Sequence, residues 1–372
     1  MIWILIGGLL TFLILQSVLL KSGWRRGLEV SVKFTDPYVY EGDKSKLQEV
    51  VVNRKWLPVS ALEVSMAMSR NLLFEGDAGE NTIKTDQTYK RDVFSFLFQE
   101  KIIRSLDFVA TRRGYYEIAE IDLNAYDYLF RNCGFAMVPQ LTQMYVYPAQ
   151  VDTRRLNLLC TAISGMLAVN NQLFPDPFEF SGIREYEPTD PMSKINWKSS
   201  ARQGKLMVNQ FDSTTNLDPV LIFDIEDSHI LKQEELVEET IRIVSSLAAR
   251  MLEKRMPLRI VSNTELNEAF APGGGKIPRI NQMLSCVTSN DRTGLGMLTE
   301  LSEDLGKMDA GTGSERVFIF VSKNNHEEIV ESIRKMAGVT TPFLWVFPRF
   351  SYEEDWQPEI PYVRVINWEV KV

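Results

Sequence analysis

The sequence predicts a fold class that combines α/β and all-β parts: an N-terminal transmembrane helix, an antiparallel β-sandwich and a doubly wound, mostly parallel sheet. Three observations predict it. No charged residue occurs between Ile2 and Leu20. Between residues 28 and 148, short segments alternate apolar and polar side chains. From Pro219 onward, apolar runs take turns with amphipathic helical patterns, which is typical of a parallel sheet.

The first of these observations predicts a membrane span. As one helix, Ile2–Leu20 reaches roughly 28 Å, which is close to the thickness of the hydrocarbon core of a bilayer. Lys21, Arg25 and Arg26 follow the segment directly, and no Lys or Arg precedes it. Because positive charge favours the cytoplasmic side of a span, we expect a single-pass protein of the cell membrane with its soluble domains in the cytoplasm.

Trp3 and Trp24 stand at the two ends of this segment, where indole rings favour a membrane interface. A cleaved signal peptide is the competing interpretation of the same residues. The start of the chain lacks a basic region, the apolar stretch is long, and no small-residue cleavage pattern follows it. We therefore expect an anchor that is retained.

Four regions are expected along the chain. Alternating patterns bounded by turn residues end near Pro148, and helical spacing of apolar residues begins at Val151. The predicted boundaries are a transmembrane anchor with its basic flank at 1–27, a β-sandwich domain at 28–148, a linking helix and signature segment at 149–218, and an α/β domain at 219–372.

Individual elements follow from the same patterns. The strands expected in the sandwich include Leu28–Phe34, Lys46–Val52, Leu62–Met66, Ile102–Ala110, Tyr115–Leu123 and Gln143–Tyr147. The helices expected after them are Val151–Val169, Glu234–Arg255, Arg279–Val287, Leu295–Met308 and Glu327–Met336. The strands expected between those helices are Val220–Phe223, Leu258–Ser262, Arg316–Ser322 and Phe343–Phe347.

Composition narrows the functional classes. The chain has 372 residues, of which 45% are hydrophobic and 24% charged, and it is long enough for two hydrophobic cores. Its net charge of −8 argues against nucleic-acid binding, because a phosphate backbone requires a basic face. The three cysteines, Cys133, Cys160 and Cys286, lie far apart and lack the spacing of a zinc site or disulfide framework.

The signature segment, residues 180–205, is the most specific part of the sequence. It contains Arg184-Glu185-Tyr186, then Pro188-x-Asp190, Ile195-x-Trp197 and Ser200-Ala201-Arg202. This order, followed by an apolar strand that ends at Asp224, resembles the bacterial domain-of-unknown-function 58 (DUF58) family. The runs Thr111–Tyr116 and Tyr145–Pro148 also look like landmarks of that family.

The resemblance carries expectations of its own. It implies a β-sandwich-like segment followed by a domain like the von Willebrand factor type A domain. It also implies a MoxR-type AAA ATPase as partner, because families that look like this one commonly occur with such ATPases. Two positions depart from the family pattern: Thr189 replaces the usual Gly before Asp190, and Asn196 replaces a frequent Asp before Trp197.

A cation site is expected only in degenerate form. Type A domains bind a divalent cation through D-x-S-x-S, whereas this chain reads Asp224-Ile225-Glu226-Asp227-Ser228. Only Asp224 and Ser228 match the motif, and Glu226 stands between them. In the later loops, Lys276 and Lys323 occupy the places where the family implies further cation ligands. We expect lysine–carboxylate pairs instead of a metal, and no cofactor, with Mg²⁺ as the remaining alternative.

The signature segment itself allows two interpretations. Its charges alternate in sign, so one role is a network that clamps the segment to the sheet, with Trp197 as a packing anchor. The other is a docking surface, because Arg, Tyr and Trp dominate binding hot spots. The candidate docking residues are Arg184, Glu185, Tyr186, Asp190, Trp197 and Arg202.

Taken together, these residues predict a membrane-anchored, non-enzymatic scaffold or adaptor. The family resemblance implies that it works with a MoxR-type AAA ATPase in the assembly of protein complexes or in processes of the cell envelope. Two alternatives stay open. One is an extracytoplasmic, cation-dependent adhesion protein, which needs the opposite topology. The other is an enzyme that uses Arg184, Glu185 and Asp190, although no nucleophile or cofactor motif accompanies them.

Overall fold

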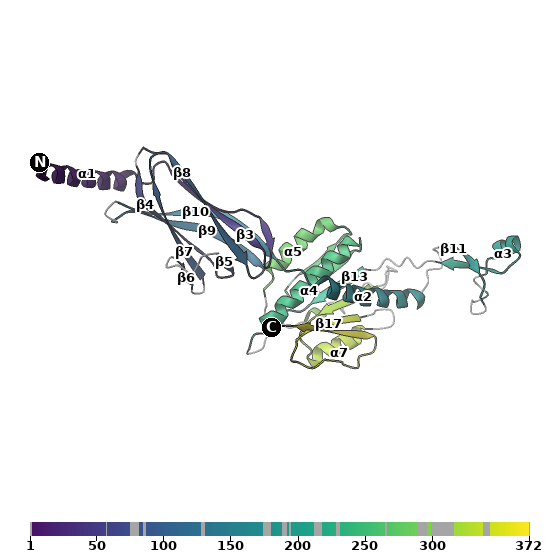
Figure 1. The fold of residues 1–372 in the computed structure, drawn as a ribbon. Coiled ribbons are helices and arrows are strands. Elements are labelled where there is room, and N and C mark those ends of the chain that lie inside the picture. The colour runs from purple at the N-terminus through teal and green to yellow at the C-terminus, as the bar shows by residue number, and fades with distance from the viewer. Residues whose placement is uncertain are drawn as a thin grey trace. The chain divides into compact units, whose positions relative to one another are not determined.

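The structure is a computed structural model whose chain divides into two compact units (Figure 1). It describes residues 2–56, 58–74, 82–84, 87–127, 131–173, 180–187, 192, 195–211, 218–227, 231–264, 266–288, 296–298, 316–337 and 343–371. The first unit holds residues 1–149 and 281–286, and the second holds residues 150–280 and 287–372.

The N-terminal segment forms a helix, α1 (Ile2–Gly23), but the membrane span predicted for it is wrong. A span must be both about 20 residues long and apolar along that length. Within the described ranges, no helix meets both conditions. The predicted fold class is therefore corrected at its first element. Trp24, which we expected at a membrane interface, is only 8% exposed and belongs to the hydrophobic core of the first unit.

Two sheets make up the rest of the first unit. One has the order β1-β3-β8-β5, and its strands are β1 (Leu28–Phe34), β3 (Lys44–Asn53), β8 (Glu100–Ala110) and β5 (Leu72–Phe74). The other has the order β2-β10-β9-β4-β7-β6, and its strands are β2 (Tyr38–Tyr40), β10 (Asn132–Tyr147), β9 (Gly114–Tyr126), β4 (Val59–Ser69), β7 (Gln87–Phe96) and β6 (Thr82–Lys84). Neighbouring strands are antiparallel, except that β2 runs parallel to β10.

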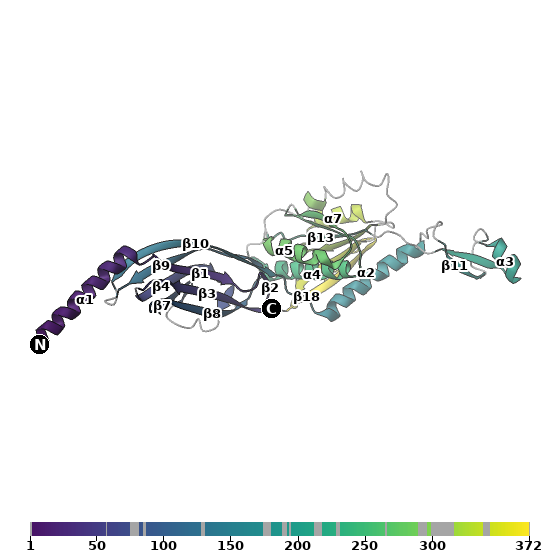
Figure 2. The same ribbon diagram turned by 90° about the horizontal axis from the view of Figure 1, so that it is seen from above.

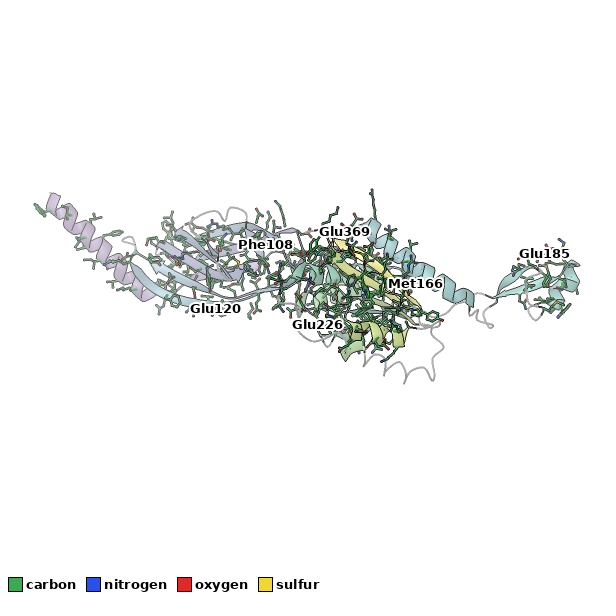
Figure 3. All side chains as sticks on the ribbon, turned by 90° about the horizontal axis from the view of Figure 1, so that it is seen from below. Phe108, Glu120, Met166, Glu185, Glu226 and Glu369 are labelled. Carbon is green, nitrogen blue, oxygen red and sulfur yellow. The ribbon has the colours of Figure 1, made fainter. Side chains whose placement is uncertain are left out.

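Alternation along these strands builds the core that the sequence pattern predicts. In β3, every second residue from Ser45 to Asn53 is buried, and Leu47 and Val51 join a cluster that also includes Val64 of β4 and Met144 of β10. Both sheets thus contribute to one core, in which Phe108 of β8 is fully buried (Figure 3).

The outer edge of β1 is closed by side chains of β10. The backbone N–H of Val32 donates to Oε1 of Gln140 at 2.9 Å, and Nε2 of Gln140 donates to the carbonyl of Val30 at 3.2 Å. The N–H of Phe34 donates to Oγ1 of Thr142 at 3.1 Å. A register shift between residues 139 and 142 of β10 accompanies these contacts, so a bulge presents both side chains to β1.

Gly134 of β10 is the place where Trp24 packs. A Cβ at position 134 would overlap the indole ring of Trp24. We therefore expect Gly134→Ala to destabilise the first unit by about 1–3 kcal/mol, because the ring must leave its site or the strand must shift. Urea unfolding followed by circular dichroism measures this. Gly182→Ala is the matched control, because nothing lies within 4 Å of its added Cβ; equal losses in the two variants would contradict the packing argument.

The second unit is built on a six-stranded sheet of order β15-β14-β13-β16-β17-β18. Its strands are β13 (Asp218–Phe223), β14 (Leu258–Ser262), β15 (Asn267–Phe270), β16 (Arg316–Val321), β17 (Phe343–Phe350) and β18 (Val363–Val370). All neighbours are parallel except β14 and β15, which are antiparallel. Numbered along the chain, this order is 3-2-1-4-5-6, which is found in doubly wound dinucleotide-binding folds.

Helices lie against both faces of this sheet. Successive side chains of a strand point to opposite faces. Val220 and Ile222 of β13 share a hydrophobic cluster with Ile329 and Ile333 of α7 (Glu327–Met336). The opposite face is covered by α4 (Glu234–Glu253), as Figure 2 shows for this unit. Other helices among the described residues are α2 (Thr153–Leu173), α3 (Trp197–Gln203), the 3₁₀ turn η2 (Gly274–Lys276) and α5 (Ile277–Cys286), whose residues 281–286 belong to the first unit.

The predicted strands and helices can be compared one by one with those of the structure. The strands Leu28–Phe34 and Leu258–Ser262 and the helix Glu327–Met336 are confirmed residue for residue. The sequence did not predict β15, β18 or α3. Most of the predicted helix Leu295–Met308 lies outside the described residues.

Candidate functional site

The end of the sheet at β13 and β16 is the first candidate site. The strand order reverses there, since the chain moves from β13 to β14 on one side and later to β16 on the other. In doubly wound sheets, ligands bind at such a switch point, beyond the carboxyl ends of the strands. Asp224 follows β13, Asn263 follows β14, and the run Ser322-Lys323-Asn324 follows β16. Short polar segments of three strands therefore meet at this edge.

The carboxylate of Asp224 is buried, with 1% of the residue exposed, and both oxygens accept hydrogen bonds. Its Oδ1 accepts from Nδ2 of Asn263 at 2.8 Å and from the N–H of Glu226 at 3.0 Å. Its Oδ2 accepts from Oγ of Ser322 at 3.0 Å and from Nδ2 of Asn324 at 2.8 Å. Burial raises the pKa of this carboxyl, and the hydrogen bonds from Asn324, Glu226 and Ser322 oppose that rise.

Backbone partners fix the orientation of both amides. The N–H of Ile225 can only donate, and it donates to Oδ1 of Asn263 at 3.2 Å, so the amide nitrogen of Asn263 must face Asp224. The carbonyl of Glu226 can only accept, and it accepts from Nδ2 of Asn324 at 3.1 Å. The amide nitrogen of Asn324 must therefore face Asp224 as well.

This arrangement does not fit a divalent cation. Mg²⁺ and Ca²⁺ are held by oxygen ligands, whereas Asp224 is surrounded by N–H and O–H donors that already use both of its oxygens. Across the part of the chain that the structure describes, no three His, Cys, Asp or Glu side chains are placed to hold a metal ion. Ser228, the third member of the predicted cation set, lies outside the described residues. The described members, Asp224 and Glu226, form a hydrogen-bonded network instead.

Lys323 forms a buried ion pair in the same region. Its Nζ lies 3.1 Å from Oδ1 of Asp227, and the two side chains are 1% and 0% exposed. Oε1 of Gln233 also accepts from Nζ, at 3.4 Å. The other oxygen of Asp227 accepts from the N–H of Gln233 at 2.9 Å, where α4 begins. The pair therefore ties the end of β16 to the first turn of α4, and the negative charge stands at the favourable end of the helix dipole.

One of the two lysines forms the expected kind of pair, because Lys323 pairs with the carboxylate of Asp227. Lys276 is exposed in η2, and the residue after β14 that contacts Asp224 is Asn263. Sequence reasoning missed Asn263 and Asn324. Their signal was present, because each belongs to a polar run that follows a buried strand directly.

The signature segment is the second candidate site. It forms β11 (Phe180–Glu185) and α3, and β11 pairs with the antiparallel strand β12 (Met207–Phe211). The segment is therefore extended over Phe180–Glu185 and helical over Trp197–Gln203.

Asn196 begins the short helix. Its side chain accepts from the N–H of Ser199 at 2.9 Å, and its amide nitrogen donates to Oδ1 of Asn209 in β12 at 2.7 Å. Gly204 ends the helix in a left-handed conformation, with φ of 67°. Asn and Asp cap helices equally well, so the departure from the family pattern at position 196 preserves the cap.

The predicted docking residues differ in exposure. Trp197 is 65% exposed, and Arg202 is exposed on the same helix. Arg184 and Tyr186 are half-buried. The indole of Trp197 is therefore not buried within its own segment, as a packing anchor would be.

The structure describes only one of the two acidic residues among the predicted docking residues. Glu185, labelled in Figure 3, is exposed and pairs with Lys205 at 3.2 Å. Asp190 lies outside the described residues. The structure therefore brings Arg184, Glu185 and Tyr186 together on and beside one strand, and it does not place Asp190 beside them.

Apolar side chains around this segment are more often exposed than buried. Ile195, Met207 and Val208 are buried. Four larger apolar side chains are exposed: Ile183, Met192, Trp197 and Leu206. Exposed apolar and aromatic residues beside arginines are typical of protein-binding surfaces.

Residues 182–340 match the family model described as "Protein of unknown function DUF58". The resemblance to the DUF58 family that the signature segment indicated is thus confirmed for these residues. The match begins inside β11 and runs through the sheet of the second unit as far as the segment before β17, while the sandwich lies outside it. No curated protein matches the chain.

Solved structures resemble only about a third of the chain. A CARDB domain from Pyrococcus furiosus, solved with di-metal ions, is 16% identical, with 32% of this chain and 89% of that chain covered and a TM-score of 0.21. A non-cellulosomal cohesin from Archaeoglobus fulgidus is 12% identical, with 32% and 91% covered and a TM-score of 0.21. The conserved hypothetical protein BatB from Bacteroides thetaiotaomicron is 14% identical, with 36% and 66% covered and a TM-score of 0.25.

Proposed function

We propose that this chain is a non-enzymatic adaptor that docks a protein partner through the signature segment. The exposed indole of Trp197 carries the proposal. An indole exposed beside an arginine on a short capped helix has the chemistry of an interface hot spot.

The network at the end of the sheet also supports an adaptor over an enzyme. A catalytic carboxylate must reach a substrate, whereas Asp224 is buried and its oxygens are already hydrogen-bonded. Lys323 is likewise engaged by Asp227. These groups hold strand ends and a helix start together, which suits a structural role.

A MoxR-type AAA ATPase is the partner that we propose, on the basis of the family resemblance. The second unit would then be the type A-like part of the adaptor, and its strand order and antiparallel edge strand β15 support that assignment. The complex would act in the assembly of other proteins.

The test is the variant Trp197→Ala. Because Trp197 is exposed, we expect unfolding stability to change by less than about 0.5 kcal/mol. We expect the affinity for the ATPase to fall by about fivefold or more, because a hot-spot side chain contributes more than about 1 kcal/mol to binding.

Pull-down of the tagged chain with the ATPase, with and without ATP, measures the binding. Tyr352→Ala is the matched control, since this aromatic residue is 76% exposed outside the signature segment. Unchanged binding in the Trp197 variant would remove the docking surface from the proposal, and absence of any ATPase with the wild type would remove the partner.

A further inference from the structure

Three loops meet at one end of the sandwich and form a surface that we call the loop tip. They are residues 23–29, from the end of α1 into β1, residues 53–56, from the last residue of β3 onward, and residues 97–101, from the turn after β7 into β8. The N–H of Arg54 donates to the carbonyl of Gly27 at 2.7 Å, and the N–H of Gln99 donates to the carbonyl of Lys55 at 3.1 Å. Nδ2 of Asn53 donates to the carbonyl of Leu97 at 2.7 Å. These bonds hold the three loops side by side.

Large apolar side chains project from the loop tip. Trp56 is 74% exposed, Leu97 is 65% exposed and Phe98 is 54% exposed. The rings of Trp56 and Phe98 stack, with their centroids 5.6 Å apart and their planes 13° from parallel. Two loops therefore present one aromatic surface to solvent, at the cost of exposing apolar area.

Basic residues belong to the same three segments as these rings. The loop tip carries five basic residues, Arg25, Arg26, Arg54, Lys55 and Lys101, and two acidic ones, Glu29 and Glu100. Glu29 pairs with Arg54 at 2.9 Å, and the carboxylate of Glu100 accepts from the N–H of Leu97 at 2.7 Å. The surface is thus positive on a chain whose net charge is −8.

This excess of positive charge indicates which kind of binding partner the loop tip suits. An acidic chain is repelled by an anionic surface unless a basic face turns toward it. Each Lys or Arg held near an anionic bilayer favours binding by about fivefold. Indole and phenyl rings favour the boundary between headgroups and acyl chains. A surface that has exposed aromatic side chains and an excess of basic residues combines the two preferences.

We propose that the loop tip docks on the headgroups of an anionic lipid bilayer, with Trp56, Leu97 and Phe98 entering the interface and the basic side chains contacting lipid phosphates. The contact is peripheral. Its residues differ from those of the docking surface at the signature segment.

Vesicle sedimentation of the full chain tests the proposal, with phosphatidylcholine vesicles compared with mixed phosphatidylcholine and phosphatidylglycerol vesicles. We expect the wild type to partition at least tenfold more strongly onto the anionic vesicles. Changing Arg25, Arg26 and Lys101 together to Gln should abolish that preference, and added salt should do the same. Lys55 stays unchanged, because its Nζ donates to the carbonyl of Trp24 and supports the fold.

The apolar contribution is tested with a second variant. Trp56→Ser with Phe98→Ser should weaken partitioning onto both kinds of vesicle, whereas Tyr89→Ser, which alters a half-exposed aromatic of β7, should leave it unchanged. Brominated lipids should quench the tryptophan fluorescence of the wild type more than that of Trp56→Phe, a variant that keeps an aromatic ring in place.

Several outcomes would overturn the proposal. They are equal partitioning of the wild type onto the two kinds of vesicle, partitioning that the charge variant does not alter, or equal quenching of wild type and Trp56→Phe. Loss of ATPase binding in the loop-tip variants with unchanged vesicle binding would show that the loop tip is a protein interface instead.

Discussion

Glu49→Gln should be more stable than the wild type at pH 8 and above, and the two should be similar near pH 4.5. Glu49 lies on β3 with 0% exposure, inside the sandwich. Among the described residues, neither of its carboxyl oxygens receives a hydrogen-bond donor. A fully buried carboxylate without donors is destabilised strongly, so this group favours its neutral form.

The groups that face Glu49 come from two other strands. Asp92 of β7 is 3% exposed, and its Oδ1 lies 2.9 Å from Nη1 of Arg104 in β8. Lys90, also on β7, stands over the ring of Phe74 at 4.7 Å. Burial raises the pKa of Glu49 to about 8, the charge of Asp92 adds to the rise, and Arg104 and Lys90 oppose it. A protonated Glu49 can donate a hydrogen bond to Asp92.

The sign of the pH dependence follows from this shift. In the unfolded chain Glu49 loses its proton near its usual pKa of 4.5, whereas in the folded chain it keeps the proton up to about pH 8. The folded state therefore binds more protons across this window, and stability falls as pH rises through it. Each pH unit in the window corresponds to roughly 1.4 kcal/mol. Glutamine is neutral at every pH and can donate the same hydrogen bond, so the variant should lose this dependence.

Urea unfolding of wild type and Glu49→Gln at intervals from pH 4.5 to 9 measures the effect. We expect the difference in unfolding free energy to grow with pH and to level off above about pH 8, at a few kcal/mol. Glu120→Gln is the control, because this residue is exposed on β9 (Figure 3). Parallel curves for wild type and Glu49→Gln would show that Glu49 is not held neutral.

The second large effect concerns the pair Lys323–Asp227. Either Lys323→Met or Asp227→Asn leaves one buried charge without its partner, and we expect each to cost about 3–5 kcal/mol of unfolding free energy. The double variant leaves neither charge buried. It should therefore be destabilised by clearly less than the sum of the two single changes, with a coupling of about 1–3 kcal/mol.

A double-mutant cycle in urea measures that coupling. The exposed pair Lys205–Glu185, whose N–O distance of 3.2 Å is similar, serves as the control. Its side chains are 65% and 63% exposed, so its coupling should stay within about 1 kcal/mol. Additive losses at Lys323 and Asp227 would mean that burial, and not charge pairing, determines the cost of each change.

Much of the fold could be predicted because its strands have unambiguous patterns. Val220–Phe223 is apolar throughout, as a strand buried on both faces must be, and Glu327–Met336 has acids in its first turn and bases in its last. The sequence pattern failed at β18, where Val363, Val365 and Ile366 are only half-buried at a sheet edge. It also failed at α1, where an uncharged stretch suggested a span that the structure does not support.

The position of the candidate site could be predicted from the sequence, but the residues that contact the carboxylate of Asp224 could not. A strand that ends in Asp224 marks the edge of a parallel sheet, and the sequence alone shows it. Which later residue reaches that carboxylate depends on the length of each loop. Asn263 follows its strand immediately, whereas the expected Lys276 lies beyond a further strand, β15, that the pattern did not reveal.

The contacts of Gln140 and Thr142 with β1 bear on how copies of this chain behave toward one another. An outer strand with open N–H groups is a template on which a second copy can add a strand, and repeated addition leads to aggregates. Here the N–H groups of Val32 and Phe34 are already occupied by side chains from within the same unit. The bulge in β10 therefore hinders a second copy of the chain from adding a strand at β1.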